Sequence, residues 1–279
     1  MSLSVWIPFA LLAVAVWSVQ RVVTKVALVR WTTPYFYRLN AALSLLVYIP
    51  YAIVAPPDPN GIAVAVGLSL LMAGTFWVTT EATRRGPIGL VAPLTALSPA
   101  LTAALAIALL AERPPIQAEL AIPLALLAAA LLAYRPAAPG AISGWLGLAV
   151  VSLAMQGVGA FVAKVVVSGP GPTDLLLTSA VVQLAVGAAL ARSEPLAMKR
   201  LARGPGLIVA ATMIAAAVAT IGYLYALSIG PASLIVPFVA TSPAFGGLLG
   251  VFFLGEARTR RQLVAIGLGA VAAALLATG

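Results

Sequence analysis

Long apolar segments separated by short polar breaks make up most of this sequence. A helix that crosses a bilayer needs about 20 mostly apolar residues, and the chain divides into ten segments of about that length. The breaks between them hold turn-forming residues, for example at residues 56–61 and 140–144. The pattern therefore predicts ten spanning helices, at residues 5–28, 34–54, 62–83, 87–111, 117–134, 145–167, 173–191, 206–227, 231–255 and 262–277.

The second half of the sequence repeats the first. Residues 86–133 align without a gap on residues 230–277, with Glu112 on Glu256 and the same Ala-Leu block at the close. Further identical pairs are Gly86/Gly230, Pro87/Pro231, Pro93/Pro237, Ser98/Ser242 and Pro99/Pro243. Chance matches between Ala- and Leu-rich segments would not put these prolines, serines and glutamates in one register. The chain is therefore expected to be a duplication of one unit.

Five helices per unit fix how the two units enter the membrane. An odd number of spans sends the second unit in from the opposite side. The expected fold is thus an all-α membrane protein with ten transmembrane helices as two inverted five-helix repeats. The first repeat covers residues 1–134, a linker covers 135–144, and the second, inverted repeat covers 145–279. Inverted repeats of this kind are an architecture of alternating-access transporters.

The composition fits a chain that faces lipid, and it excludes several kinds of functional site. Hydrophobic residues make up 62% of the sequence and charged residues 8%, whereas soluble domains carry roughly 25% charged residues. The absence of Cys and His excludes disulfides, thiolate chemistry and the usual transition-metal ligands, so no cofactor or metal is expected. The first apolar run is too long for a signal-peptide core and lacks a basic segment before it, which indicates a retained span.

The basic residues are spread between apolar runs rather than gathered in one patch. The net charge of +9 therefore indicates membrane topology and no nucleic-acid partner. The loops that follow odd-numbered spans hold Arg30, Arg84, Arg85, Arg135, Arg192, Lys199, Arg200, Arg203, Arg258, Arg260 and Arg261, and the other loops hold Arg113. Because positively charged loops stay in the cytoplasm, both termini are expected outside it.

Several residues resemble a known family. Trp17, Lys25 and Arg38 match positions of the EamA-type members of the drug/metabolite transporter superfamily. The second half resembles the same family at Ala226, Pro231, Ala232, Ser233, Pro243, Gly255, Glu256, Gln262 and Gly267. The resemblance implies a ten-helix carrier of the amino-acid and metabolite exporter branch, or an exchanger of nucleotide sugars or phosphorylated sugars. Residues 81–85 depart from the family pattern, and family members commonly have both termini inside, which opposes the charge count.

A polar face on the first helix is the first candidate site. Polar residues at membrane depth are costly, so each needs a reason. Trp17, Gln20, Arg21 and Thr24 lie at i, i+3, i+4 and i+7, which is one helical face. We interpret Trp17, Gln20 and Arg21 as substrate-binding residues at a wet cavity. The alternative is a polar stripe that only bonds to neighbouring helices.

The third helix repeats this arrangement, which adds three substrate-binding candidates: Trp77, Thr80 and Glu81. Arg21 and Glu81 are expected at similar depth, where a salt bridge would hold both charges. Alternatively, Glu81 is an interfacial carboxylate that pairs with Arg84 or Arg85.

The second half offers fewer polar groups. Gln156 occupies the position of Trp17 in the repeat, and Tyr223 is a further substrate-binding candidate, although tyrosines near helix ends are typical of an interfacial belt. The fourth and ninth helices are expected to kink, because proline removes a backbone donor. The gating or helix-kink candidates are Pro93, Ser98, Pro99, Pro237, Ser242 and Pro243. Glu112 and Glu256, beside Arg113 and near Arg258, fit gating or loop-anchoring pairs.

The sequence favours a secondary transporter of a small polar metabolite in the cytoplasmic membrane, with amino-acid export as the first candidate. Arg21, Lys25 and Arg38 would give one vestibule a positive field that suits a carboxylate or phosphate, unless Lys25 and Arg38 extend to the interface. The alternatives are a sugar-phosphate or nucleotide-sugar exchanger and an intramembrane lipid-modifying enzyme. No catalytic constellation supports an enzyme. The expected partners are a small-molecule substrate and the lipid bilayer, and a monomer fits the sequence.

Overall fold

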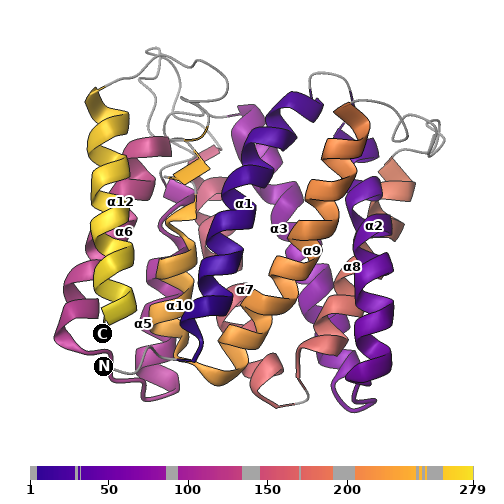
Figure 1. The fold of residues 1–279 in the computed structure, drawn as a ribbon, viewed down its shortest axis with the longest axis horizontal. Helices are drawn as coiled ribbons and strands as arrows, with labels where there is room; N and C mark the ends of the chain where they lie inside the picture. The colour runs from indigo at the N-terminus through magenta and orange to yellow at the C-terminus, as the bar shows by residue number, and fades with distance from the viewer. Residues whose placement is uncertain are drawn as a thin grey trace.

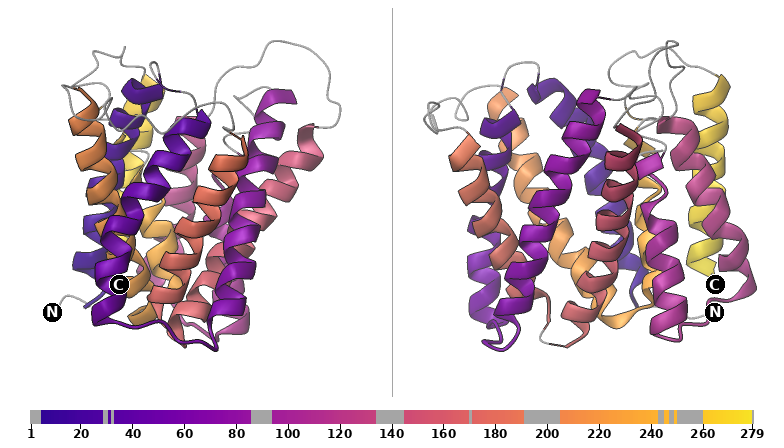
Figure 2. Two further views of the ribbon diagram at one scale, coloured as in Figure 1. Left: turned by 90° about the vertical axis from the view of Figure 1, so that its right-hand side faces the viewer. Right: turned by 180° about the vertical axis from the view of Figure 1, so that it is seen from behind.

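The structure is a computed structural model that describes residues 5–28, 31, 33–85, 94–133, 145–169, 171–190, 205–242, 245–246, 249 and 260–278. Within these ranges the regular structure is helical throughout, and no strand occurs. The helices stand side by side as one bundle (Figures 1 and 2). The side chains of Arg21, Lys25 and Thr80 lie outside the described part of the chain.

The described helices follow the predicted segments closely. They are α1 (Ile7–Leu28), α2 (Thr33–Val54), α3 (Ile62–Arg85), α5 (Ser98–Leu109), α6 (Ile116–Ala133), α7 (Trp145–Ser168), α8 (Pro172–Leu190), α9 (Pro205–Ile229), α10 (Ala232–Val239) and α12 (Arg260–Thr278). Outside the fourth and ninth expected spans, each begins and ends within two residues of the predicted bounds.

Six of the described helices are long and apolar enough to cross a membrane: α1, α2, α3, α7, α8 and α9. Shorter apolar runs occur in α5, α6 and α12, at Ser98–Leu109, Ile116–Ala128 and Leu263–Leu276. The described residues thus give a membrane-spanning helical bundle, and the full set of ten spans stays a prediction.

The fourth and ninth expected spans are interrupted at equivalent positions. Residues 96–97 and 240–241 form turns in the same register as the sequence repeat, and each turn comes just before a serine of a Ser-Pro pair. After the first turn, α5 begins at Ser98 with Pro99 in its opening positions, where the missing N–H of proline has no helical partner to lose. Pro237 lies inside α10 and does not end it. Pro93 and Pro243 lie outside the described residues.

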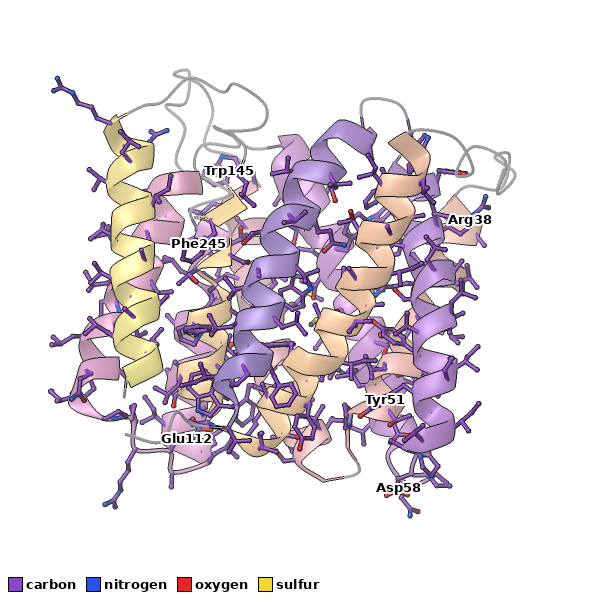
Figure 3. The ribbon with its side chains drawn as sticks, in the orientation of Figure 1. Arg38, Tyr51, Asp58, Glu112, Trp145 and Phe245 are labelled. Atoms are coloured by element: carbon purple, nitrogen blue, oxygen red, sulfur yellow. The ribbon has the colours of Figure 1, made fainter. Side chains whose placement is uncertain are left out.

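The two halves enter the bundle from opposite ends. Both chain termini lie at one end (Figure 1), and we call this the terminal end; it also holds Asp58 and Glu112 (Figure 3). Helix α1 begins at the terminal end, whereas α7, the first helix of the second half, begins with Trp145 at the opposite end (Figure 3).

The contacts between helices come in corresponding pairs. By the register of the sequence repeat, α1, α2, α3 and α6 correspond to α7, α8, α9 and α12, whereas α5 follows the turn in the fourth span and α10 precedes the turn in the ninth. Helix α1 packs against α9, and its counterpart α7 packs against α3, the counterpart of α9. Likewise α2 packs against α9 while α8 packs against α3. Two counterpart pairs pack against each other, α2 with α8 and α6 with α12, and α5 packs against α10 across the two halves.

The largest buried apolar cluster lies toward the terminal end, and we call it the terminal-end core. It draws on the first half of α1, the last turns of α7 and α9, the start of α8 and all of α10. Its larger members are Trp6, Ile7, Val14, Val166, Val167, Leu175, Leu176, Leu224, Leu227, Leu234, Ile235, Val236, Phe238 and Val239. Trp6 meets the ring of Phe238 edge-on, with ring centroids 5.8 Å apart. The helices are therefore tightly packed against one another across both halves at this end.

Candidate functional site

A polar cavity lies between helices of the two halves. Its volume is about 250 Å³, and α1, α2, α8 and α9 contribute its walls. The lining residues are Trp17, Gln20, Asn40, Ser44, Tyr48, Ser179, Ala180, Gln183, Ala216, Ala217 and Thr220. On α2 these residues lie between Arg38 and Tyr51, which are labelled in Figure 3 near the two ends of that helix. The cavity therefore lies between the two ends of α2, with walls from both halves.

Helical spacing explains how each wall is built. On α2, Asn40, Ser44 and Tyr48 follow one another at intervals of four residues, which places them on one face. Ser179 and Gln183 on α8 have the same spacing. Four such faces meet at the cavity, so polar residues that are scattered along the sequence are brought to one place.

One wall of the cavity is aromatic. The rings of Trp17 and Tyr223 are tilted by 57° to each other, with centroids 5.3 Å apart. Tyr223 lies behind Trp17 and is not itself a lining residue. The hydroxyl of Tyr48 lies within hydrogen-bonding reach of the side chains of Ser44 and Thr220. Thr220 Oγ1 donates to the carbonyl of Ala216 at 2.8 Å, so its oxygen keeps lone pairs that can accept from Tyr48.

Three carboxamides give the cavity its binding capacity: those of Gln20, Asn40 and Gln183. Each carries two N–H donors and one oxygen acceptor. The carboxamides themselves are uncharged. They can therefore bind neighbouring donor and acceptor groups of a small solute that carries no net charge. Among the described side chains, no Lys, Arg, Asp or Glu lines this cavity. Arg38 is 8% exposed and is not one of the lining residues.

The structure brings only part of the sequence-predicted site together. Trp17 and Gln20 line the cavity, and the side chains of Arg21 and Thr80 lie outside the description. Trp77 does not line the cavity, and its side chain is 57% exposed.

The remaining candidates have other neighbours. Glu81 pairs with Arg85, with 2.6 Å between Oε1 and Nε, which matches one of the two alternatives considered for Glu81. Gln156 Nε2 donates to Ser152 Oγ at 3.0 Å, and Ser152 also contacts the hydroxyl of Thr79. Neither Glu81 nor Gln156 is a lining residue of the cavity.

The kink candidates act at helix crossings. Ser18 Oγ on α1 lies 2.5 Å from the carbonyl oxygen of Val14 and 3.0 Å from that of Ser242, at the interruption after α10, so its one proton is shared between them. In the other half, Thr102 Oγ1 donates to the carbonyl of Ser98 at 3.3 Å and to that of Gly157 on α7 at 2.9 Å. These hydroxyls bond backbone carbonyls at both interruptions, which offsets part of the cost of the broken helical ladder.

Sequence reasoning missed Asn40, Ser44, Tyr48, Ser179, Gln183 and Thr220 as cavity residues. Polar residues four apart in an apolar helix were the signal that could have identified the first two. No group of three or more His, Cys, Asp and Glu that could hold a metal ion occurs among the residues described here.

Comparisons with known proteins place the fold and the family. No curated protein matches the sequence. A solved structure described only as "Crystal structure of protein" is similar, with a TM-score of 0.79 and 16% identity over 98% of this chain and 96% of that chain. At this identity the likeness concerns the fold alone.

The family comparison is more specific. The sequence model of the EamA-like transporter family matches twice, at residues 4–134 and at residues 143–278. The two matches cover nearly the whole chain and confirm that it contains two copies of the family unit. Together with the apolar helices, they make the protein an integral, multi-pass membrane protein. The chain belongs to the EamA-like transporter family, within the drug/metabolite transporter superfamily, as Trp17, Lys25 and Arg38 indicated.

Proposed function

We propose that the protein is a secondary transporter that moves a small polar metabolite across the cytoplasmic membrane by alternating access, with amino-acid export as the first candidate. The observation that carries the proposal is the cavity between the two halves, with its aromatic wall and three carboxamides. Binding sites of carriers built from inverted repeats lie at the interface of the repeats.

The arrangement of the halves supports alternating access. Helices α1 and α7 begin at opposite ends of the bundle, and helix contacts recur between counterparts. We infer ten spans in two inverted repeats, with 1–134 and 145–279 as the repeating units. Such a framework can adopt two related states, each open to one side of the membrane. If each repeat takes the conformation of the other, the open end of the bundle closes and the closed end opens.

The lining chemistry supports a solute without a net charge. Carboxamides and hydroxyls donate to a carboxylate and accept from an ammonium group, so a zwitterionic amino acid can satisfy both kinds of partner. The indole of Trp17 supplies an apolar wall, which is how small-molecule sites usually combine shape with a few placed polar groups. A cavity of about 250 Å³ suits a metabolite smaller than a drug-sized ligand, which needs roughly 300 Å³ or more.

A sugar-phosphate or nucleotide-sugar exchanger is the competing function. Phosphate groups are usually held by Arg or Lys through charge-assisted hydrogen bonds. The described lining of the cavity contains neither residue, so the observation favours the amino acid over the phosphorylated solute.

The test is counterflow in proteoliposomes that contain the purified protein. The panel pairs glutamine with glutamate and asparagine with aspartate, and adds lysine, uridine and glucose 6-phosphate. We expect exchange of the neutral amino acids and little exchange of the acidic, basic or phosphorylated solutes. Exchange of glucose 6-phosphate alone would instead identify the competing function. Repeating the active pair with an imposed pH gradient identifies proton coupling.

Orientation is a separate prediction. By the charge count, both termini lie outside the cytoplasm, because nearly all loop arginines and lysines follow odd-numbered spans. A reporter that fluoresces only in the cytoplasm, fused after Gly279, should therefore stay dark. A fusion before Trp145, at the opposite end of the bundle (Figure 3), should be bright. The reverse result would favour the family precedent of termini inside.

A further inference from the structure

Two charged side chains hold one short segment at the terminal end. The segment is the α9–α10 junction, residues 227–233. Lys164 Nζ donates to the carbonyls of Leu227 at 2.7 Å and Gly230 at 2.8 Å. Glu112 accepts from the backbone amides of Ala232 and Ser233, both at 2.8 Å, and from the Ser233 hydroxyl at 2.5 Å. The same short junction therefore carries five hydrogen bonds to two ionisable groups.

Both charges match the helix ends that they meet. The last carbonyls of a helix and the first amides of the next have no partner within their own helix. Helix α9 ends at Ile229, so Lys164 sits at a negative helix end, and α10 begins at Ala232, so Glu112 sits at a positive one. Each side chain thus gives these end groups a hydrogen-bond partner that their own helix lacks, which stabilises the closed junction.

Glu112 connects the two halves of the protein. It follows α5, which belongs to the first half, whereas the junction belongs to the second. Ala111 has a φ of 53°, a left-handed conformation that L-residues seldom adopt and that costs roughly 1–2 kcal/mol. This turn ends the first-half helix so that the next residue reaches α10. If the halves move relative to each other at this end, the Glu112 bonds must break.

The junction also closes over the terminal-end core. Gly230 packs directly on Trp6: a Cβ atom at Gly230 would lie 2.7 Å from the Trp6 ring. A surface hollow of about 720 Å³ adjoins the same contact and is lined by Trp6, Glu112, Arg113, Gly230 and Pro231 among others. Water in this hollow can solvate the Glu112 carboxylate when its bonds to α10 are released, which lowers the cost of opening.

We propose that Glu112 and Lys164 are gating residues that hold the terminal end closed and release the α9–α10 junction when that end opens. The inference rests on the proposed function, because a gate has a role only in a protein that alternates between two open states. Whether the two residues hold the terminal end closed can be measured without a substrate, from the accessibility of buried positions at each end. Neither Glu112 nor Lys164 lines the polar cavity, and Glu112 lies at the terminal end (Figure 3), so the two gating residues act on the conformation and not on the solute.

The test uses the absence of native cysteine. Ala10→Cys places a single thiol in the terminal-end core, and Ala149→Cys places one near the opposite end; both alanines are fully buried. In each background the labelling rate with a membrane-impermeant maleimide is measured with Glu112→Gln and with Lys164→Met. We expect labelling of Ala10→Cys to rise about tenfold, which corresponds to about 1.4 kcal/mol, and labelling of Ala149→Cys not to rise.

Glu119→Gln is the matched control, because it removes the same charge from an exposed position in the first turn of α6. It should leave both labelling rates unchanged. Equal increases at both thiols would mean general loosening, and unchanged labelling at Ala10→Cys would mean that these bonds do not hold the end closed; either result overturns the gate. If the labelling shifts as expected but no solute in the counterflow panel exchanges, the gate stands and the substrate assignment fails.

Discussion

Gln20→Ala should raise the solute concentration needed for half-maximal uptake about ten- to hundredfold. The Gln20 carboxamide lines the cavity, and one hydrogen bond to a charged group of a ligand contributes about 1.5–3 kcal/mol, which gives that range. Trp17→Ala should have an effect of similar size, because it removes the aromatic wall and the contact with Tyr223. The measurement is the initial uptake rate over a range of concentrations, together with thermal stability in detergent.

Val19→Ala is the matched control for this experiment. Val19 lies on the same helix between the two cavity residues, but its side chain is 46% exposed and does not line the cavity. Its uptake should resemble that of the unchanged protein. Normal uptake by both Trp17→Ala and Gln20→Ala would mean that the α1 face only packs against neighbouring helices and does not bind the solute. If the variants lose uptake only because their thermal stability falls, the two residues likewise support the fold and not the binding of the solute.

Asn40→Ala and Gln183→Ala extend the same argument to the opposite walls. Their carboxamides line the cavity from α2 and α8, so each should weaken apparent affinity by a similar factor if the solute bridges the two halves. A loss confined to Gln20→Ala would instead mean that the solute binds to the first helix alone.

Much of the helical organisation could be predicted because the bilayer imposes it. A span must be long and apolar, and turn-forming residues must interrupt it, so both ends of α2 and α7 lie within a residue of their predicted positions. The duplication was equally accessible, since Ser98-Pro99 and Ser242-Pro243 fall in one register. The turns at 96–97 and 240–241 then occur at equivalent places, as a repeated local sequence would dictate.

The site was less accessible, because one helix does not reveal which of its faces meets a cavity. Trp17 and Trp77 begin similar polar stripes, yet Trp17 lines the cavity and Trp77 is 57% exposed. Asn40 and Ser44 are spaced as one face on α2, but only the packing of α2 against α8 and α9 turns that face into a wall. Such pairings depend on the shape of neighbouring side chains and backbones, which the hydropathy pattern does not encode.

A close contact between the halves at Gly157 leads to the last prediction. Gly157 on α7 meets α5, and a Cβ atom at this position would lie 2.8 Å from Leu101 Cβ and 2.9 Å from Leu101 Cγ. The neighbouring Thr102 hydroxyl donates to the Gly157 carbonyl at 2.9 Å. Small residues let membrane helices approach closely enough for such bonds. The Cβ of Leu101 cannot rotate away, so relief of a clash would require the helices to separate.

Gly157→Ala should therefore destabilise the protein by about 1–3 kcal/mol, the usual cost of overpacking. Gly147→Ala on the same helix is the control, because nothing lies within 4 Å of its new Cβ atom. It should be neutral or stabilising by up to about 1 kcal/mol, since alanine favours the helix over glycine. Thermal unfolding of both variants in one detergent measures the difference. Equal transitions would mean that α5 and α7 can separate without cost, and would contradict a rigid crossing there. A lower transition for Gly157→Ala alone would mark this crossing as a tight contact between the two halves.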